Sequence, residues 1–208
     1  MSQALVNEPV FEFTGGNLCL DFTNTLSGRR AQPRERLTSY EDLVAWGRQA
    51  GVLTDADALL LERIAAEHPR DATRMFAEAV ALREALYRIL SSVIEGAPPG
   101  QEEFAFLNAA LSRAMDRLRV ARGAGGFGWA WAAEEETLDR MLWPVIRSAA
   151  DLLVSGEAQR VRRCASETCD WLFLDTSRNH SRRWCDMSGC GNRAKARRHY
   201  ARAKAGRL

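Results

Sequence analysis

Long hydrophobic runs are absent from this chain of 208 residues. No apolar stretch approaches the roughly eighteen residues that a membrane span requires, which excludes a membrane-spanning class and predicts no membrane partner. Residues 1–9 also lack the basic start and apolar stretch of a secretory signal. We therefore expect a cytoplasmic protein whose cysteines stay reduced.

Catalytic signatures are also scarce. Residues 123–128 fit the letters of a dinucleotide-binding loop, G-x-G-x-x-G, but such a loop should open a helix. Phe127, Trp129 and Trp131 instead alternate as in a strand, which predicts a hairpin with residues 118–122 and an aromatic stripe in the core. We find no phosphate loop, nucleophile motif or open metal site, so we expect no enzymatic activity.

Cysteine occurs only five times, and four of the five lie in the last fifth of the chain. Cys164 and Cys169 form one pair, and Cys185 and Cys190 form a second pair with the same spacing. Each pair can close a tight turn with both thiolates facing one ion, and the residues between can form a hairpin. Four thiolates complete the tetrahedral shell of Zn²⁺ and leave no position for water or substrate. The pattern therefore predicts a structural zinc site.

Other uses of these cysteines fit less well. Two disulfides would require an oxidising compartment, which nothing at the N-terminus indicates. An iron–sulfur cluster also takes four cysteines, but ferredoxin spacings differ from this one. His180 or His199 could replace one cysteine as a ligand, although four cysteines already fill the shell.

Charge is distributed unevenly along the chain. Residues 160–208 contain thirteen basic and four acidic residues, a net charge of +9, whereas residues 1–159 carry −7. Zinc with four thiolates adds about −2 to the basic end, which leaves it near +7. A basic module on an acidic body is typical of a nucleic-acid-binding protein.

The same region resembles a known family. The segments 169–175, 177–179, 183–187 and 190–195, which include Cys-Gly-Asn-Arg at 190–193, are similar to the CGNR-type zinc finger over about forty residues. Residues 16–26 resemble the start of the ABATE-type domain that accompanies this finger, in a shorter match. The resemblance implies a bacterial, stress-induced transcription regulator with a DNA-binding finger at its C-terminus.

Helical periodicity dominates the acidic part. It predicts helices over residues 40–49, 54–68, 71–94, 102–118 and 134–155, with Ser39 or Thr38 and Thr54 as caps and a kink at Pro144. Residues 10–13 alternate as in a short strand. The expected fold is mainly α: a helical N-terminal domain with short β-hairpins (1–158), followed by a small treble-clef-like finger with a hairpin and a basic helix (159–208).

Two polar features stand out near the N-terminus. Asp21, Asn24 and Thr25 share one helical face; they either satisfy nearby backbone groups or line a ligand pocket of the N-terminal domain. Residues 27–36 form a loop with four arginines, which is solvated or binds an anion.

These patterns predict a zinc-dependent DNA-binding regulator whose helical domain senses a small molecule or a protein. The alternative is an RNA-binding or protein-binding adaptor stapled by zinc, and the patterns carry no information on oligomeric state. The predicted contacts with duplex DNA are basic residues of the finger: Arg178, Arg182, Arg183, Arg193, Lys195, Arg197 and Arg198.

Overall fold

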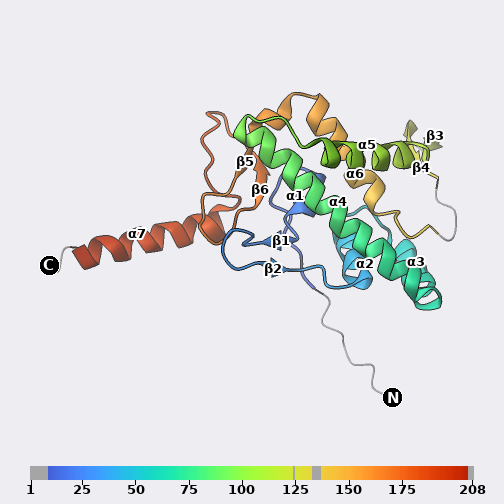
Figure 1. The fold of residues 1–208 in the computed structure, drawn as a ribbon, viewed down its shortest axis with the longest axis horizontal. Coiled ribbons are helices and arrows are strands. Elements are labelled where there is room, and N and C mark those ends of the chain that lie inside the picture. The colour runs from blue at the N-terminus through green and yellow to red at the C-terminus, as the bar shows by residue number, and fades with distance from the viewer. Residues whose placement is uncertain (1–8, 124, 133–136, 206–208) are drawn as a thin grey trace, which may run out of the picture.

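The fold is mainly α-helical, as predicted (Figure 1). The computed structural model describes residues 9–123, 125–132 and 137–205, without the side chains of 198, 199 and 201–205. Its helices are α1 (Leu18–Thr23), α2 (Tyr40–Gln49), α3 (Asp55–Glu67), α4 (Pro69–Glu95), α5 (Gln101–Met115), α6 (Leu142–Val154) and α7 (Asn192–Ala205). Short helical turns occupy η1 (Glu157–Arg160) and η2 (Met187–Gly191).

Each of the three sheets is an antiparallel pair of strands. They are β1 (Leu26–Ser27) with β2 (Arg34–Glu35), β3 (Leu118–Gly123) with β4 (Gly126–Trp131), and β5 (Val161–Arg163) with β6 (Leu172–Leu174). The second and third hairpins confirm the predicted strand pairs.

Two helix starts follow from local capping chemistry. Ser39 accepts the N–H of Asp42 at the start of α2, and Thr54 forms a reciprocal capping box with Asp57 at the start of α3. Pro69 is the first residue of α4. Proline is tolerated there because an N–H at this position would have no partner within the helix. The two predicted caps are therefore confirmed.

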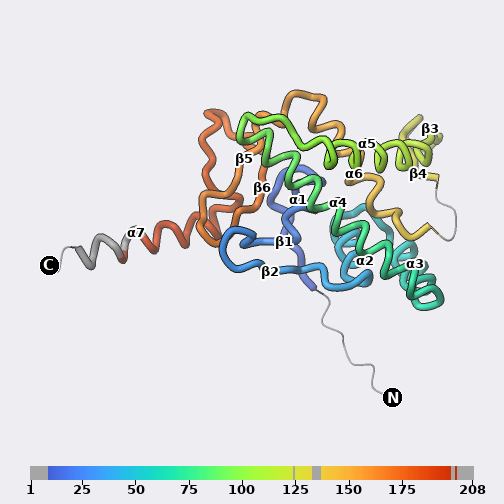
Figure 2. Tube along the Cα trace, in the orientation of Figure 1, coloured from blue at the N-terminus to red at the C-terminus, as the bar shows by residue number. Residues whose placement is uncertain are grey.

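The core surrounds α1, which packs against α4, α6 and β6 (Figures 1 and 2). Leu20 and Phe22 of α1 are fully buried. The same core includes Val161 of β5 and Leu172 and Leu174 of β6. The last hairpin therefore packs on the helices through apolar side chains, and the division at residues 158 and 159 stays a prediction.

Four local predictions differ from the structure or fall outside the residues that it describes. Residues 10–13 form no strand, because the N–H of Phe11 donates to the side chain of Gln49 instead of a neighbouring strand. The aromatic stripe is core only in part: Phe127 is 80% and Trp129 63% exposed, whereas Trp131 packs against the core. Pro144 lies in the first turn of α6, where it needs no kink. The predicted helix start at 134–136 lies outside the described residues.

No helix in the described part of the chain combines the length and the apolar character needed to cross a membrane.

Helix α7 extends away from the rest of the molecule (Figures 1 and 2). Its main packing contact is with η2, the turn that carries Cys190. Its position is thus fixed at the cysteine cluster, and its exposed residues include Lys195 and Arg197.

Candidate metal centre and nucleic-acid interface

The four predicted cysteines come together. Cys164, Cys169, Cys185 and Cys190 are buried, and their Sγ atoms all lie within 4.8 Å of one another. Cys164 follows β5 and Cys169 precedes β6; Cys185 lies just before η2, and Cys190 lies near the end of η2. The fifth cysteine, Cys19, lies in the helical core, where burial raises its pKa to about 12.

The spacing of the sulfur atoms fits a tetrahedral metal site. The Sγ atoms of Cys169 and Cys185 are 3.6 Å apart, and those of Cys185 and Cys190 are 3.8 Å apart. A tetrahedron with Zn–S bonds of about 2.3 Å has edges of about 3.8 Å. The cluster is therefore a metal-binding site with a closed shell of four soft ligands.

Neighbouring groups hold the ligand turns in place. The N–H of Cys164 donates to Trp171 O at 2.8 Å, and the N–H of Ala165 donates to Arg183 O at 2.8 Å. Asp186 accepts the N–H of Gly189 at 2.6 Å and so closes the second turn. These bonds orient the turns that carry the four sulfur atoms toward one another.

Arg193 also supports the cluster. Its guanidinium donates to the Sγ of Cys190 at 3.0 Å, and this hydrogen bond raises the pKa of Arg193. A positive donor on a ligand sulfur offsets part of the negative charge of a four-thiolate site. His180 is not in the cluster, since its Nδ1 lies 3.4 Å from Asp175 O. The side chain of His199 is outside the described set.

The predicted nucleic-acid contacts fall into two groups. Arg178, Arg183, Arg193, Lys195 and Arg197 are exposed, and Arg197 pairs with Glu167 at 3.1 Å. The side chain of Arg198 is outside the described set. Arg182 instead turns inward: its guanidinium lies 4.5 Å from the centre of the Phe173 ring and donates to the carbonyls of Thr14, Trp184 and Cys185. Arg182 is therefore mainly a packing residue.

The polar face of α1 connects the two ends of the chain. Asn24 donates to Leu172 O at 2.8 Å and accepts the Leu172 N–H at 2.8 Å. Thr25 donates to Phe22 O and accepts from Arg83. Asp21 accepts the N–H of Gly15 at 2.8 Å. These side chains hold the fold together; that they also line a ligand pocket stays a prediction.

Asp21 should give the stability a specific pH dependence. Burial raises its pKa from 3.8 to about 6. The folded state therefore binds more protons than the unfolded state between about pH 4 and pH 6, so the free energy of unfolding should fall as pH rises through this window. The loss is at most about 3 kcal/mol.

Urea unfolding of the wild type and Asp21→Asn between about pH 4 and pH 7 tests this linkage. The variant should show a flatter profile, whereas Asp116→Asn, at an exposed position, should follow the wild type. Equal pH profiles for the wild type and Asp21→Asn would contradict the prediction.

Sequence patterns missed a charged network that holds β2 on α4. Arg83 of α4 is 1% exposed and forms a double contact with Glu35 of β2, at 2.6 and 2.7 Å. Arg29 donates to Glu84 and lies 3.9 Å from the centre of the Tyr87 ring. In the sequence, Arg83 falls among the apolar residues that recur with helical period in α4. A charged residue at such a position was the signal that could have revealed this network.

A closed four-thiolate centre at the base of an exposed basic helix defines a metal-binding finger. The chain belongs to the ABATE family, because the model of that family, described as "Putative stress-induced transcription regulator", matches residues 16–156. The CGNR zinc finger model matches residues 160–203. Both predicted resemblances are confirmed in the expected order. No curated protein matches the chain.

Proposed function

We propose that the protein is a zinc-dependent, DNA-binding transcription regulator that presents α7 to duplex DNA. The supporting observation is the position of α7, which extends from the body with its root fixed at the cysteine cluster. Six basic residues lie between Arg193 and Lys204, and an anionic partner would relieve their mutual repulsion.

Zinc is the metal that this donor set favours. Four thiolates at tetrahedral spacing select zinc or an iron–sulfur centre over hard cations. The match to a zinc finger family favours zinc between these two. A closed shell supplies folding energy and leaves no position for a substrate, so we propose binding without catalysis. A regulator of bacterial DNA would act in the cytoplasm.

Salt dependence tests the DNA proposal directly. If about five phosphates are neutralised, the logarithm of the association constant should fall against the logarithm of salt concentration with a slope near −4.5. Fluorescence anisotropy with a labelled random duplex, titrated between about 50 and 300 mM salt, measures this slope. Binding that does not change with salt would contradict the proposal.

Competition separates DNA from the alternative partners. Unlabelled duplex DNA, structured RNA and an acidic polypeptide should be compared as competitors on the same sample. Stronger competition by RNA or by the polypeptide would favour the adaptor function. Selection of bound sequences from random DNA and RNA pools, with the zinc content measured in parallel, would then identify the preferred site.

A further inference from the structure

A hollow of about 970 Å³ lies between the β1–β2 loop and the metal-binding finger, and it takes in the metal site through Cys169, Cys185 and Cys190. Arg34 and Arg36 line it from the N-terminal region, and Arg193 and Arg197 line it from α7. The loop belongs to the part matched by the ABATE family and the helix to the part matched by the CGNR family. Arginines from both matched regions therefore face one space.

We infer that the DNA interface spans both regions, with a strand of the phosphate backbone lying across this hollow between Arg34 and the root of α7. The inference rests on the proposed function and adds a contact surface to it. Arginine suits this role because its planar fork binds phosphate with two parallel hydrogen bonds.

The four arginines differ in how much of their bonding capacity is used. Arg36 binds Glu12 at 3.1 Å, and Arg193 binds the Sγ of Cys190. Arg197 pairs with Glu167, but this pair is exposed and therefore weak enough to exchange for a phosphate. The side chain of Arg34 in β2 is exposed and makes no hydrogen bond or ion pair with any residue that the structure describes. Arg34 is thus the clearest available phosphate donor on the N-terminal side of the hollow.

The negative groups of the hollow are already engaged. Cys169, Cys185 and Cys190, which line its floor, belong to the metal site, and Arg193 offsets part of the charge of that site. Glu12 pairs with Arg36, and Asp186 accepts hydrogen bonds from Ser188 and from the N–H of Gly189. A phosphate that enters therefore meets guanidinium groups rather than unpaired carboxylates along this wall.

Backbone contacts fix the loop on the finger. The N–H of Gly28 donates to Cys169 O at 2.9 Å, and the N–H of Arg30 donates to Asp170 Oδ2 at 3.1 Å. Gly28 has φ +69°, and a Cβ there would lie 2.2 Å from Gln32 O, so only glycine fits. The loop is therefore rigid before DNA arrives, which lowers the entropic cost of binding.

The arrangement fits a row of phosphates better than one small anion. Helix α7, about 20 Å long at about 1.5 Å per residue, begins beside the hollow and carries Lys195 and Arg197 as exposed cations. Arg30, on the same loop, is bound to the finger through its N–H; its side chain is 61% exposed and lies 3.9 Å from Glu95 in a weak ion pair. Cations extended along a line match the backbone of a duplex.

Replacement of Arg34 in the full chain tests the inference. Arg34→Gln should make the salt slope shallower by about 0.9 and weaken DNA binding about fivefold at 0.15 M salt, because one phosphate contact is lost. Arg34→Lys keeps the charge and should retain most of the slope. Thermal unfolding should be unchanged in both variants, since the side chain is exposed.

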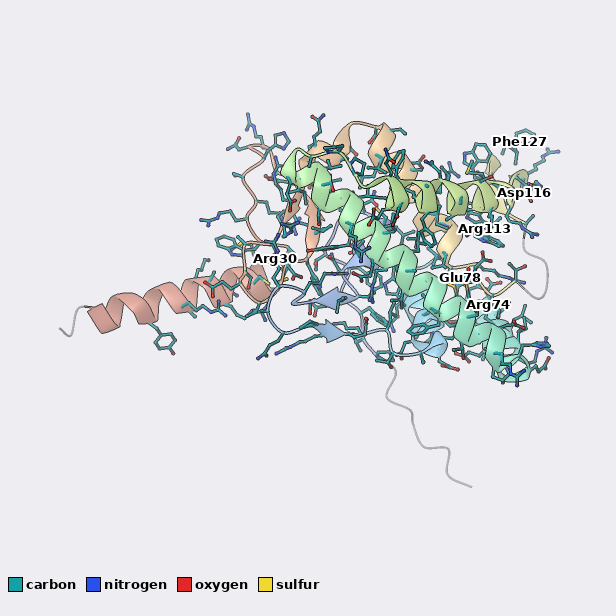
Figure 3. All side chains as sticks on the ribbon, viewed as in Figure 1. Arg30, Arg74, Glu78, Arg113, Asp116 and Phe127 are labelled. Atoms are coloured by element: carbon teal, nitrogen blue, oxygen red, sulfur yellow. The ribbon has the colours of Figure 1, made fainter. Side chains whose placement is uncertain are left out.

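Two further variants separate this inference from the function on which it rests. Lys195→Ala, on α7, should also make the slope shallower, whereas Arg113→Ala, at the far end of the molecule in Figure 3, should not. If Lys195→Ala weakens binding and Arg34→Gln matches the wild type, the two-region interface is wrong and the proposed function stands. If the wild type shows no salt-dependent binding to DNA, the proposed function fails as well.

Competition between DNA and inorganic phosphate at constant ionic strength distinguishes a site for the extended backbone from a site for one small anion. About 10 mM phosphate should leave the DNA affinity unchanged if the hollow binds only the extended backbone. Displacement of DNA by phosphate in the wild type, but not in Arg34→Gln, would identify a small-anion site and overturn the inference.

Discussion

Removal of the metal should unfold the finger and abolish DNA binding. Structural zinc contributes on the order of 10 kcal/mol to small domains, which is comparable with the total stability of a typical protein. The effect should also reach the helical part, because Leu172 and Leu174 of β6 belong to its core. Near-ultraviolet circular dichroism, which reports on Trp171 and Trp184 beside the cluster, should change on addition of a chelator.

Cysteine variants provide the matched comparison. Cys185→Ala should lower the metal content and the DNA affinity together. Cys19→Ala removes a thiol that is equally buried but lies in the helical core, so it should leave one metal per chain. An unchanged spectrum and unchanged affinity after chelation would contradict a structural role of the metal.

Asn24→Ala should destabilise the protein by about 4 kcal/mol, since it leaves both the N–H and the C=O of Leu172 without a partner and each buried group costs about 1–3 kcal/mol. Asn24 is 2% exposed and Leu172 is fully buried, so water cannot replace the lost bonds easily. Urea unfolding followed by circular dichroism measures the change.

The control for this prediction is Asn108→Ala, at an exposed position of α5. That change should be neutral or slightly stabilising, because alanine has the higher helix propensity. Equal stability of the two variants would show that the pair between Asn24 and Leu172 does not support the fold.

Local chemistry explains why several features could be predicted from the sequence. The spacing of the four cysteines identifies one metal site because each short loop brings two thiolates together. Ser39 and Thr54 begin helices because their hydroxyls satisfy N–H groups only three residues away. The glycines between the two strands allow a tight turn, so the hairpin of β3 and β4 could also be predicted from neighbouring residues.

Contacts between distant residues were not predictable in this way. The partner of Asn24 lies 148 residues away in sequence, so its spacing alone could not choose between a backbone contact and a ligand. Phe127 and Trp129 have the alternation of a buried strand, but both are largely exposed, and Trp129 contacts the guanidinium of Arg147 on α6 at 5.0 Å. Arg182 and Arg178 look alike in the sequence, and only the ring of Phe173 and the nearby carbonyls separate their environments.

The apolar side of the last hairpin has a consequence for protein engineering. Val161, Leu172 and Leu174 are covered by the helices of the ABATE region. A chimaera that transplants the finger onto an unrelated carrier would expose this surface to solvent and favour aggregation. The finger and its carrier therefore have to be exchanged together.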